Sequence, residues 1–205
     1  MIVAVSREYG AAAMGVCSAV ADALGYRLVS RELPVVVAAR LGMRADMVES
    51  VSERPRPFAE RVLDQFSGGL PETSQPGSSV EYDLTAETRR ALETAVREVA
   101  AAGNAVIVGR LAGIILGSRP DVLRVFLHAP LAWRVAHVAA SFACSEAEAR
   151  VEIGRIDEAR RTYAKEAHQV VWDDRRNYDL MLQTSRFGVQ GSADLIVAAV
   201  RSAGG

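Results

Sequence analysis

Short β-branched runs alternate with longer helical patterns along most of this chain, and this alternation restricts its possible folds more than any other feature. Five runs are expected to be strands, at residues 2–6, 26–29, 105–108, 123–127 and 180–182. Most are continuous apolar stretches, such as Ala105-Val106-Ile107-Val108, which is typical of strands covered on both faces. Strands that alternate with helices favour a parallel sheet. The sequence therefore predicts an α/β fold with about five parallel strands and helices on both faces.

Helices are expected between these strands, and several carry start or stop signals. Gly25 is a natural stop for the first helix, and Pro34 suits the first turn of the second, where its missing N–H is not needed. Ser145 and Glu148 form a capping box at the start of another helix. The expected helical ranges are 14–24, 31–41, 85–101, 131–140, 145–161 or beyond, and 192–202.

Residues 52–83 differ in character from the rest of the chain. They combine four prolines with several glycines and serines, which is typical of a surface insertion rather than of a core. We expect a mobile insertion here, in which residues 58–66 could form one short helix.

The composition suits one globular domain. The chain has 205 residues, of which 50% are hydrophobic and 24% are charged. Its net charge of −1 gives no overall basic field, so no nucleic-acid partner is expected. No apolar stretch is long enough to span a bilayer and the start is unlike a leader, so we expect no membrane association and a cytoplasmic location. Cys17 and Cys144 lack metal-ligand spacing, and we expect two reduced, packed thiols and no metal held by side chains.

The first strand leads directly into a loop of small residues and then into a helix. The loop reads Ser6-Arg7-Glu8-Tyr9-Gly10-Ala11-Ala12-Ala13-Met14-Gly15. Backbone N–H groups and a helix N-terminus at such a turn form a site for phosphate. The pattern G-x-x-x-x-G-K-[ST] is not present, because no Lys, Ser or Thr follows the small residues. The arrangement predicts a phosphate-binding loop that lacks its usual side chains.

Two further segments are predicted to follow strands at the same edge of the sheet, namely Gly109–Arg110 and Thr184–Arg186. Ligands of parallel α/β sheets bind at this edge. Arg110 comes directly after a buried strand and is therefore interpreted as a ligand-binding residue. An arginine at this position could also cap the next helix or pair with a buried carboxylate.

Basic residues are concentrated in a segment between residues 150 and 186. They are Arg150, Arg155, Arg160, Arg161, Lys165, Arg175, Arg176 and Arg186. Phosphoryl transfer requires positioned cations, although a solvated helix face with ion pairs has the same composition. Tyr163, Trp172 and Tyr178 lie among these charges in a segment otherwise unlike core, which favours a ligand-binding role. Asp157 precedes Arg161 by one helical turn and could hold that guanidinium in place.

The three histidines are weaker candidates for chemistry. His128 follows a strand and is interpreted as structural, and His137 looks like an ordinary helix residue. His168 lies in the basic segment and is a minor candidate for contact with a ligand.

Several sequence blocks carry a recognisable pattern. They are Ile2-Val3-Ala4-Val5-Ser6-Arg7-Glu8-Tyr9-Gly10, Ala105–Arg110, Phe126–Arg134, Arg155–Tyr163, and Trp172–Asp174 with Tyr178–Arg186. In this order, and over nearly the whole chain, they resemble the cytidylate kinase-like family, a branch of the nucleoside monophosphate kinases.

The resemblance implies a P-loop kinase-type three-layer sandwich formed by one domain. Its core would comprise residues 1–30, 85–141 and 173–205, with an insertion for the nucleoside monophosphate at about 31–84 and a lid at about 142–172. It also implies that ATP and Mg²⁺ are the cofactors and that nucleotides are the partners.

The same resemblance implies roles for individual residues. Ser6, Arg7 and the residues from Gly10 to Gly15 would bind nucleotide phosphate. From the lid, Arg155, Arg160 and Arg161 would reach the donor phosphates, and Asp157 would orient them. Ser30, Gly109, Arg110 and Asp179 would lie on the acceptor side, and Arg134 near the base of the lid.

The loop departs from the family's pattern, which usually reads Gly-Ser-Gly-Gly-Arg after Glu-Tyr. Here the corresponding residues are Gly10-Ala11-Ala12-Ala13-Met14. The alanine methyl groups occupy space where phosphate approaches the backbone and disfavour positive φ, and Met14 removes a cation. Ser30 stands where an Asp is common.

These departures leave two hypotheses open. One is an ATP-dependent kinase of a nucleoside monophosphate such as CMP, with altered or weak activity. The other is a catalytically impaired relative that senses nucleotides or binds another protein. An apolar face on the helix at 34–41 would also suit a homodimer.

Overall fold

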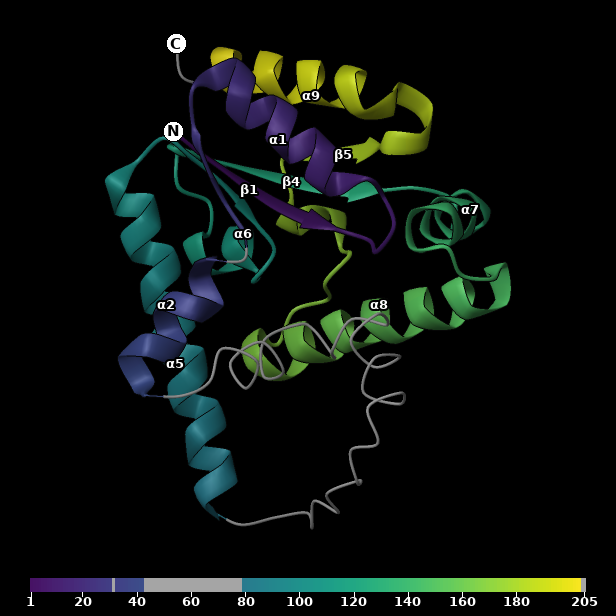
Figure 1. Cartoon of the computed structure of the whole chain (residues 1–205). Coiled ribbons are helices and arrows are strands. Elements are labelled where there is room, and N and C mark those ends of the chain that lie inside the picture. The colour runs from purple at the N-terminus through teal and green to yellow at the C-terminus, as the bar shows by residue number, and fades with distance from the viewer. Residues whose placement is uncertain (31, 43–78, 204–205) are drawn as a thin grey trace.

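A five-stranded parallel sheet forms the centre of the molecule (Figure 1). The computed structural model describes residues 1–30, 32–42 and 79–203. The strands are β1 (Ile2–Arg7), β2 (Arg27–Val29), β3 (Ala105–Val108), β4 (Val122–His128) and β5 (Leu180–Gln183). Their order across the sheet is β2-β3-β1-β4-β5, and every neighbouring pair is parallel. The prediction of a parallel α/β fold is confirmed.

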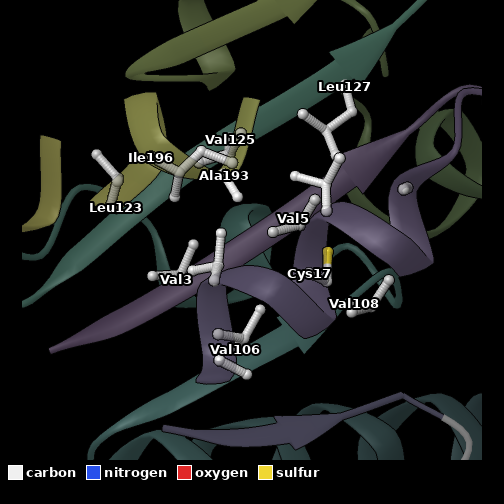
Figure 2. Close-up of a cluster of buried hydrophobic side chains, with 14 of the residues drawn as sticks. Val3, Val5, Cys17, Val106, Val108, Leu123, Val125, Leu127, Ala193 and Ile196 are labelled. Atoms are coloured by element: carbon white, nitrogen blue, oxygen red, sulfur yellow. The ribbon is translucent and has the colours of Figure 1, made fainter. Parts of the chain in front are cut away.

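Helices cover both faces of this sheet (Figure 1). They are α1 (Ala13–Leu24), α2 (Glu32–Leu41), α5 (Ser79–Ala102), α6 (Ala112–Leu116), α7 (Leu131–Phe142), α8 (Glu146–His168) and α9 (Thr184–Ala203), with a 3-10 helix η1 (Arg175–Asn177). Side chains alternate between the two faces along a strand. Val3 and Val5 therefore pack under α1 and α9 (Figure 2), while Ile2 and Ala4 pack under α2, α5 and α6. Burial on both faces explains why β1 is a continuous apolar run.

Several boundaries differ from those that the sequence predicted. The helix expected from residue 85 begins at Ser79, so residues 79–83 are helical rather than part of an irregular insertion. The last helix begins at Thr184 rather than at Ser192 and is kinked at Gly188, whose φ is 67°. The short helices α6 and η1 were not predicted. Most of the expected insertion, including the short helix at 58–66, lies outside the described residues.

The aromatic residues of the basic segment belong largely to the core, contrary to expectation. Trp172 and Tyr178 are buried, and their rings lie 5.3 and 4.9 Å from the ring of Phe126 on β4. The Tyr178 hydroxyl donates to the backbone carbonyl of Trp172. These rings fill the space between the sheet and the C-terminal half of α8, so their position is explained by packing.

On α2, Val35 and Val36 are exposed, in agreement with the expected apolar face. The homodimer inferred from that face stays a prediction. Across residues 1–30, 32–42 and 79–203, no helix is both long and apolar enough to cross a membrane.

Candidate functional site

The loop between β1 and α1 lies at the carboxyl end of the central strand. Gly10 has a φ of 82°, and Ala12 also adopts a left-handed conformation, with φ 52° and ψ 24°. Ala12 precedes the first residue of α1, and no side chain caps the helix there. The N–H groups of the first turn, at Ala13 to Gly15, have no intrahelical acceptor. They therefore form the open, positively polarised end of a helix, which suits an anion.

A cavity of about 350 Å³ opens on this loop. Its walls come from the loop, from α7, and from single residues of α8 and α9. The residues that line it are Arg7, Glu8, Tyr9, Gly10, Ala11, Ala12, Ala13, Met14, Gly15, His137, Val138, Ser141, Phe142, Arg160 and Val189. The structure thus brings Arg160 to the predicted phosphate loop, whereas Ser6 is a buried residue of β1 that does not line the cavity.

The side chains around the mouth of the cavity are mainly apolar. Met14, at the position of the missing cation, is 47% exposed, and Phe142 and Val189 are also exposed. Opposite them, Arg7 and Arg160 supply positive charge. The cavity therefore combines backbone donors and two arginines with an apolar rim.

Asp157 on α8 reaches the loop directly. Its Oδ1 accepts the Tyr9 N–H at 2.8 Å and lies 3.5 Å from the Arg160 guanidinium, and its Oδ2 accepts Arg134 Nη1 at 2.7 Å. The expected pair of Asp157 with Arg161 is wrong. Both arginines flank Asp157 at helical spacing, but only 1% of the Arg160 side chain is exposed, whereas 42% of the Arg161 side chain is exposed. It lies instead near Glu158 and Asp173, at 3.5 and 3.7 Å.

Arg134 of α7 makes contacts that sequence reasoning missed. Its guanidinium donates to the carbonyls of Ala129 and Tyr9, at 3.0 and 3.1 Å, in addition to Asp157. Glu8 Oε2 lies 3.2 Å from Arg134 Nε and also accepts the Ala129 N–H. The resemblance placed Arg134 near the base of the predicted lid but gave none of these partners, which burial of an arginine requires.

Arg160 and Arg155, two arginines of the predicted lid, are held by partners on the loop and on their own helix. Arg160 donates to the Arg7 carbonyl at 2.8 Å, and its guanidinium lies 6.0 and 5.9 Å from the Tyr9 and Trp172 ring centres. Arg155 forms a two-point ion pair with the buried Glu152, with atoms 2.6 and 2.9 Å apart. Arg160 faces the cavity, whereas Arg155 is absent from its lining.

The predicted acceptor-side residues occupy several places along the sheet. Gly109 and Arg110 leave the carboxyl end of β3 next to β1, with left-handed backbones, and Arg110 is buried. Ser30 follows β2. Asp179 precedes β5 and forms a two-point ion pair with Arg124, which lowers the pKa of the Asp179 carboxyl. Asp179 therefore lies at the amino end of β5, away from the edge of the sheet that carries the loop. The cavity at the loop includes none of these four residues.

The histidines and cysteines add little chemistry to the site. His137 lines the cavity and stacks on Trp133, with ring centres 5.0 Å apart. Both thiols are free, and burial raises the pKa of Cys17 to about 12. Within the described parts of the chain, His, Cys, Asp and Glu side chains form no group of three or more that could hold a metal ion.

Comparison with known proteins gives a consistent family and fold. The model of the cytidylate kinase-like family matches residues 2–186. A cytidylate kinase of Halobacterium salinarum is 26% identical over 200 residues, which is 98% of this chain and 89% of that protein. A cytidylate kinase of Thermococcus kodakarensis is 30% identical over 118 residues, or 58% of this chain and 60% of that one.

Solved structures share the fold at low identity. An uncharacterized protein from Eubacterium ventriosum superposes with a TM-score of 0.69 and 20% identity, over 98% of this chain and 99% of that chain. The shikimate kinase of Bacteroides thetaiotaomicron gives a TM-score of 0.54 and 15% identity, over 98% of both chains.

Proposed function

We propose that this chain, which belongs to the cytidylate kinase-like family, transfers a phosphoryl group from ATP to a nucleoside monophosphate such as CMP, with weak activity. The observation that carries the proposal is the open N-terminus of α1, which faces a cavity at the carboxyl end of the central strand. Relatives named cytidylate kinase motivate the choice of acceptor.

In this proposal the loop residues Gly10 to Gly15 hold donor phosphates through backbone N–H groups, with Arg7 and Arg160 beside them. Gly109 and Arg110 are assigned to the acceptor because they leave the strand adjacent to the loop, and Ser30 follows the next strand, β2. Asp179, which precedes β5 at the other edge of the sheet, is assigned to the acceptor on the resemblance alone. Arg155 and Arg161 approach the phosphates from α8, which serves as the lid. Mg²⁺ would neutralise phosphate charge, and the phosphates rather than a carboxylate cluster would hold it.

Weak activity follows from the side chains of the loop. A family arginine is replaced by Met14, which has no charge to stabilise the transferring group. Removing one preorganised donor from such a site typically costs about 10²–10³ in rate. The methyl groups of Ala11, Ala12 and Ala13 also line the cavity, where phosphate needs close contact with backbone.

A second function is supported by the apolar rim of the same cavity. Met14, Val138, Phe142 and Val189 favour binding of an uncharged group over tight binding of a triphosphate. In a protein that senses a nucleotide or binds a partner, without phosphoryl transfer, the cavity would hold such an uncharged group of the nucleotide or of the partner.

Calorimetry and ADP release together distinguish the two functions. The purified protein is titrated with ATP, with CMP and with both, and ADP is measured in parallel. ADP formation that requires CMP supports the kinase, whereas nucleotide binding without ADP supports the sensor. Binding of neither nucleotide would reject both the kinase and the nucleotide sensor and would leave binding of a protein partner.

The variant Arg160→Ala tests the location of the site. We expect it to weaken ATP binding by about tenfold, because it removes a charged donor from the cavity. Arg119→Ala is the matched control, since Arg119 pairs with Asp121 at the opposite end of β4 and should leave ATP binding unchanged. Equal effects of both variants would place ATP elsewhere.

A further inference from the structure

We infer that Arg134 and Asp157 are positioning residues that clamp the phosphate loop in its binding shape and join it to α8. The effect on nucleotide binding rests on the proposed function, whereas the clamp itself rests on the contacts alone.

The clamp acts on the backbone of the loop. Within three consecutive residues, the Arg7 carbonyl accepts from Arg160, the Tyr9 N–H donates to Asp157, and the Tyr9 carbonyl accepts from Arg134. These side chains come from α7 and α8, more than a hundred residues away in sequence. Backbone groups at the start of the loop are thus fixed by distant side chains rather than by the loop's own residues.

Burial makes this arrangement costly to break. The side chains of Asp157 and Arg134 are only 3% and 8% exposed. Loss of Asp157 would leave Arg134 with Glu8 at 3.2 Å, and loss of Arg134 would leave Asp157 with Arg160 at 3.5 Å, so a buried charge would be less well compensated in either case. Glu8 is a second carboxylate beside Arg134, and its Oε2 also accepts the N–H of Ala129, just before α7.

Close packing of α7 on the loop supports the same conclusion independently. A Cβ atom added at Gly10 would lie 2.8 Å from Val138 Cγ2 and 3.2 Å from the Arg134 carbonyl oxygen. Only glycine fits at this distance, so α7 lies directly against the turn that the clamp holds.

The clamp couples the loop to α8. Asp157 contacts both the Tyr9 N–H and Arg160, whose guanidinium lies about 6 Å from the centres of the Tyr9 and Trp172 rings. Movement of α8 away from the loop would break two contacts together, that of Asp157 with the Tyr9 N–H and that of Arg160 with the Arg7 carbonyl. In this proposal the shape of the loop and the position of α8 are therefore coupled, so phosphate binding at the loop favours the position in which α8 contacts it.

Hydrogen exchange at the Tyr9 amide tests the clamp without any ligand. In Asp157→Asn, we expect exchange of this amide to rise by about tenfold or more, because its buried acceptor is altered and Arg134 loses its ion pair. Glu166→Gln is the matched control, since Glu166 is an exposed carboxylate of the same helix, and it should leave this amide unchanged. Glu8→Gln, at the half-buried edge of the network, should give a smaller increase and provides a variant that folds if Asp157→Asn does not.

ATP affinity, measured on the same folded variants, tests the positioning role. We expect Asp157→Asn and Arg134→Lys each to weaken ATP binding by about tenfold, with a double variant little worse than either single one, since both break the same contact. The clamp would be overturned if hydrogen exchange at the Tyr9 amide were unchanged in the variants. A decrease in thermal stability alone, with exchange and ATP affinity unchanged, would show a merely structural role and would overturn it as well. If the wild-type protein binds no ATP, the proposed function fails, and exchange at Tyr9 alone still confirms or overturns the clamp.

Discussion

Ala12 shows how the surrounding structure can impose a backbone conformation that its side chain disfavours. Its φ of 52° lies in the left-handed region, which costs an L-residue about 1–2 kcal/mol. Glycine removes that cost but loses more backbone entropy on folding, about 0.4–1 kcal/mol. We expect Ala12→Gly to raise the free energy of unfolding by up to about 1 kcal/mol, measured by urea denaturation.

Ala13→Gly provides the opposite case one residue further on. Ala13 is buried and begins α1, so glycine there should lower the free energy of unfolding by about 0.5–1 kcal/mol. If both variants destabilise the protein equally, the conformation assigned to Ala12 is wrong.

At the residue scale, the partners of charged side chains were the least predictable feature. Helical spacing correctly placed Asp157 near arginines on its own helix, but it favoured Arg161 over Arg160. Arg134 and the Tyr9 N–H are distant in sequence, and no local pattern shows which residues α7 and α8 bring to the loop. Only the fold determines these contacts.

At the scale of elements, the C-terminal end of α8 contains a pH-sensitive contact with α5. Burial lowers the pKa of His168 below its usual value of 6.5, Arg89 and Arg97 lower it further, and Glu93 at 3.9 Å opposes them. The folded protein thus favours neutral His168, and the unfolded chain binds a proton more readily. Neutral His168 therefore contributes to the free energy of unfolding above pH 6.5, the usual pKa that it has in the unfolded chain. This contribution is lost as the pH falls through 6.5 and below.

We therefore expect the melting temperature of the wild type to fall more steeply than that of His168→Gln between about pH 7.5 and about pH 5.5. Thermal unfolding followed by circular dichroism measures the difference, and the variant corrects for carboxylates that titrate in both proteins. Parallel pH profiles would show that His168 is not held in its neutral form.

Elements with strong local signals were predicted well. The Ser145–Glu148 capping box and the left-handed Gly25 are both observed at the helix ends where the sequence placed them. The start of α5 was missed because its first turn lies within a segment rich in proline, glycine and serine. The first turns of α9 were not predicted because glycine disfavours a helix, whereas in the structure α9 continues across a kink at Gly188. Trp172 and Tyr178 were misread because charged neighbours in sequence hid a buried cluster in space.

At the scale of the whole molecule, the position of the first loop in the sheet and the proposed clamp agree with the proposed phosphate site. The apolar strands were enough to predict the parallel sheet, and its topology places the first loop at the ligand-binding edge. Backbone donors and Arg160 remain at the cavity, while Met14 replaces the family's arginine there. The central claim is that the loop has kept its shape and lost its cation.

The most direct test is the rate of ADP formation from ATP and CMP by the wild type, Met14→Arg and Met14→Gln. Met14→Gln changes polarity at similar size, so it separates the effect of charge from that of shape. We predict that Met14→Arg raises kcat/KM by about tenfold or more over both other proteins, because it returns a cation to a loop that is already positioned. A Met14→Arg variant no faster than Met14→Gln would contradict the account.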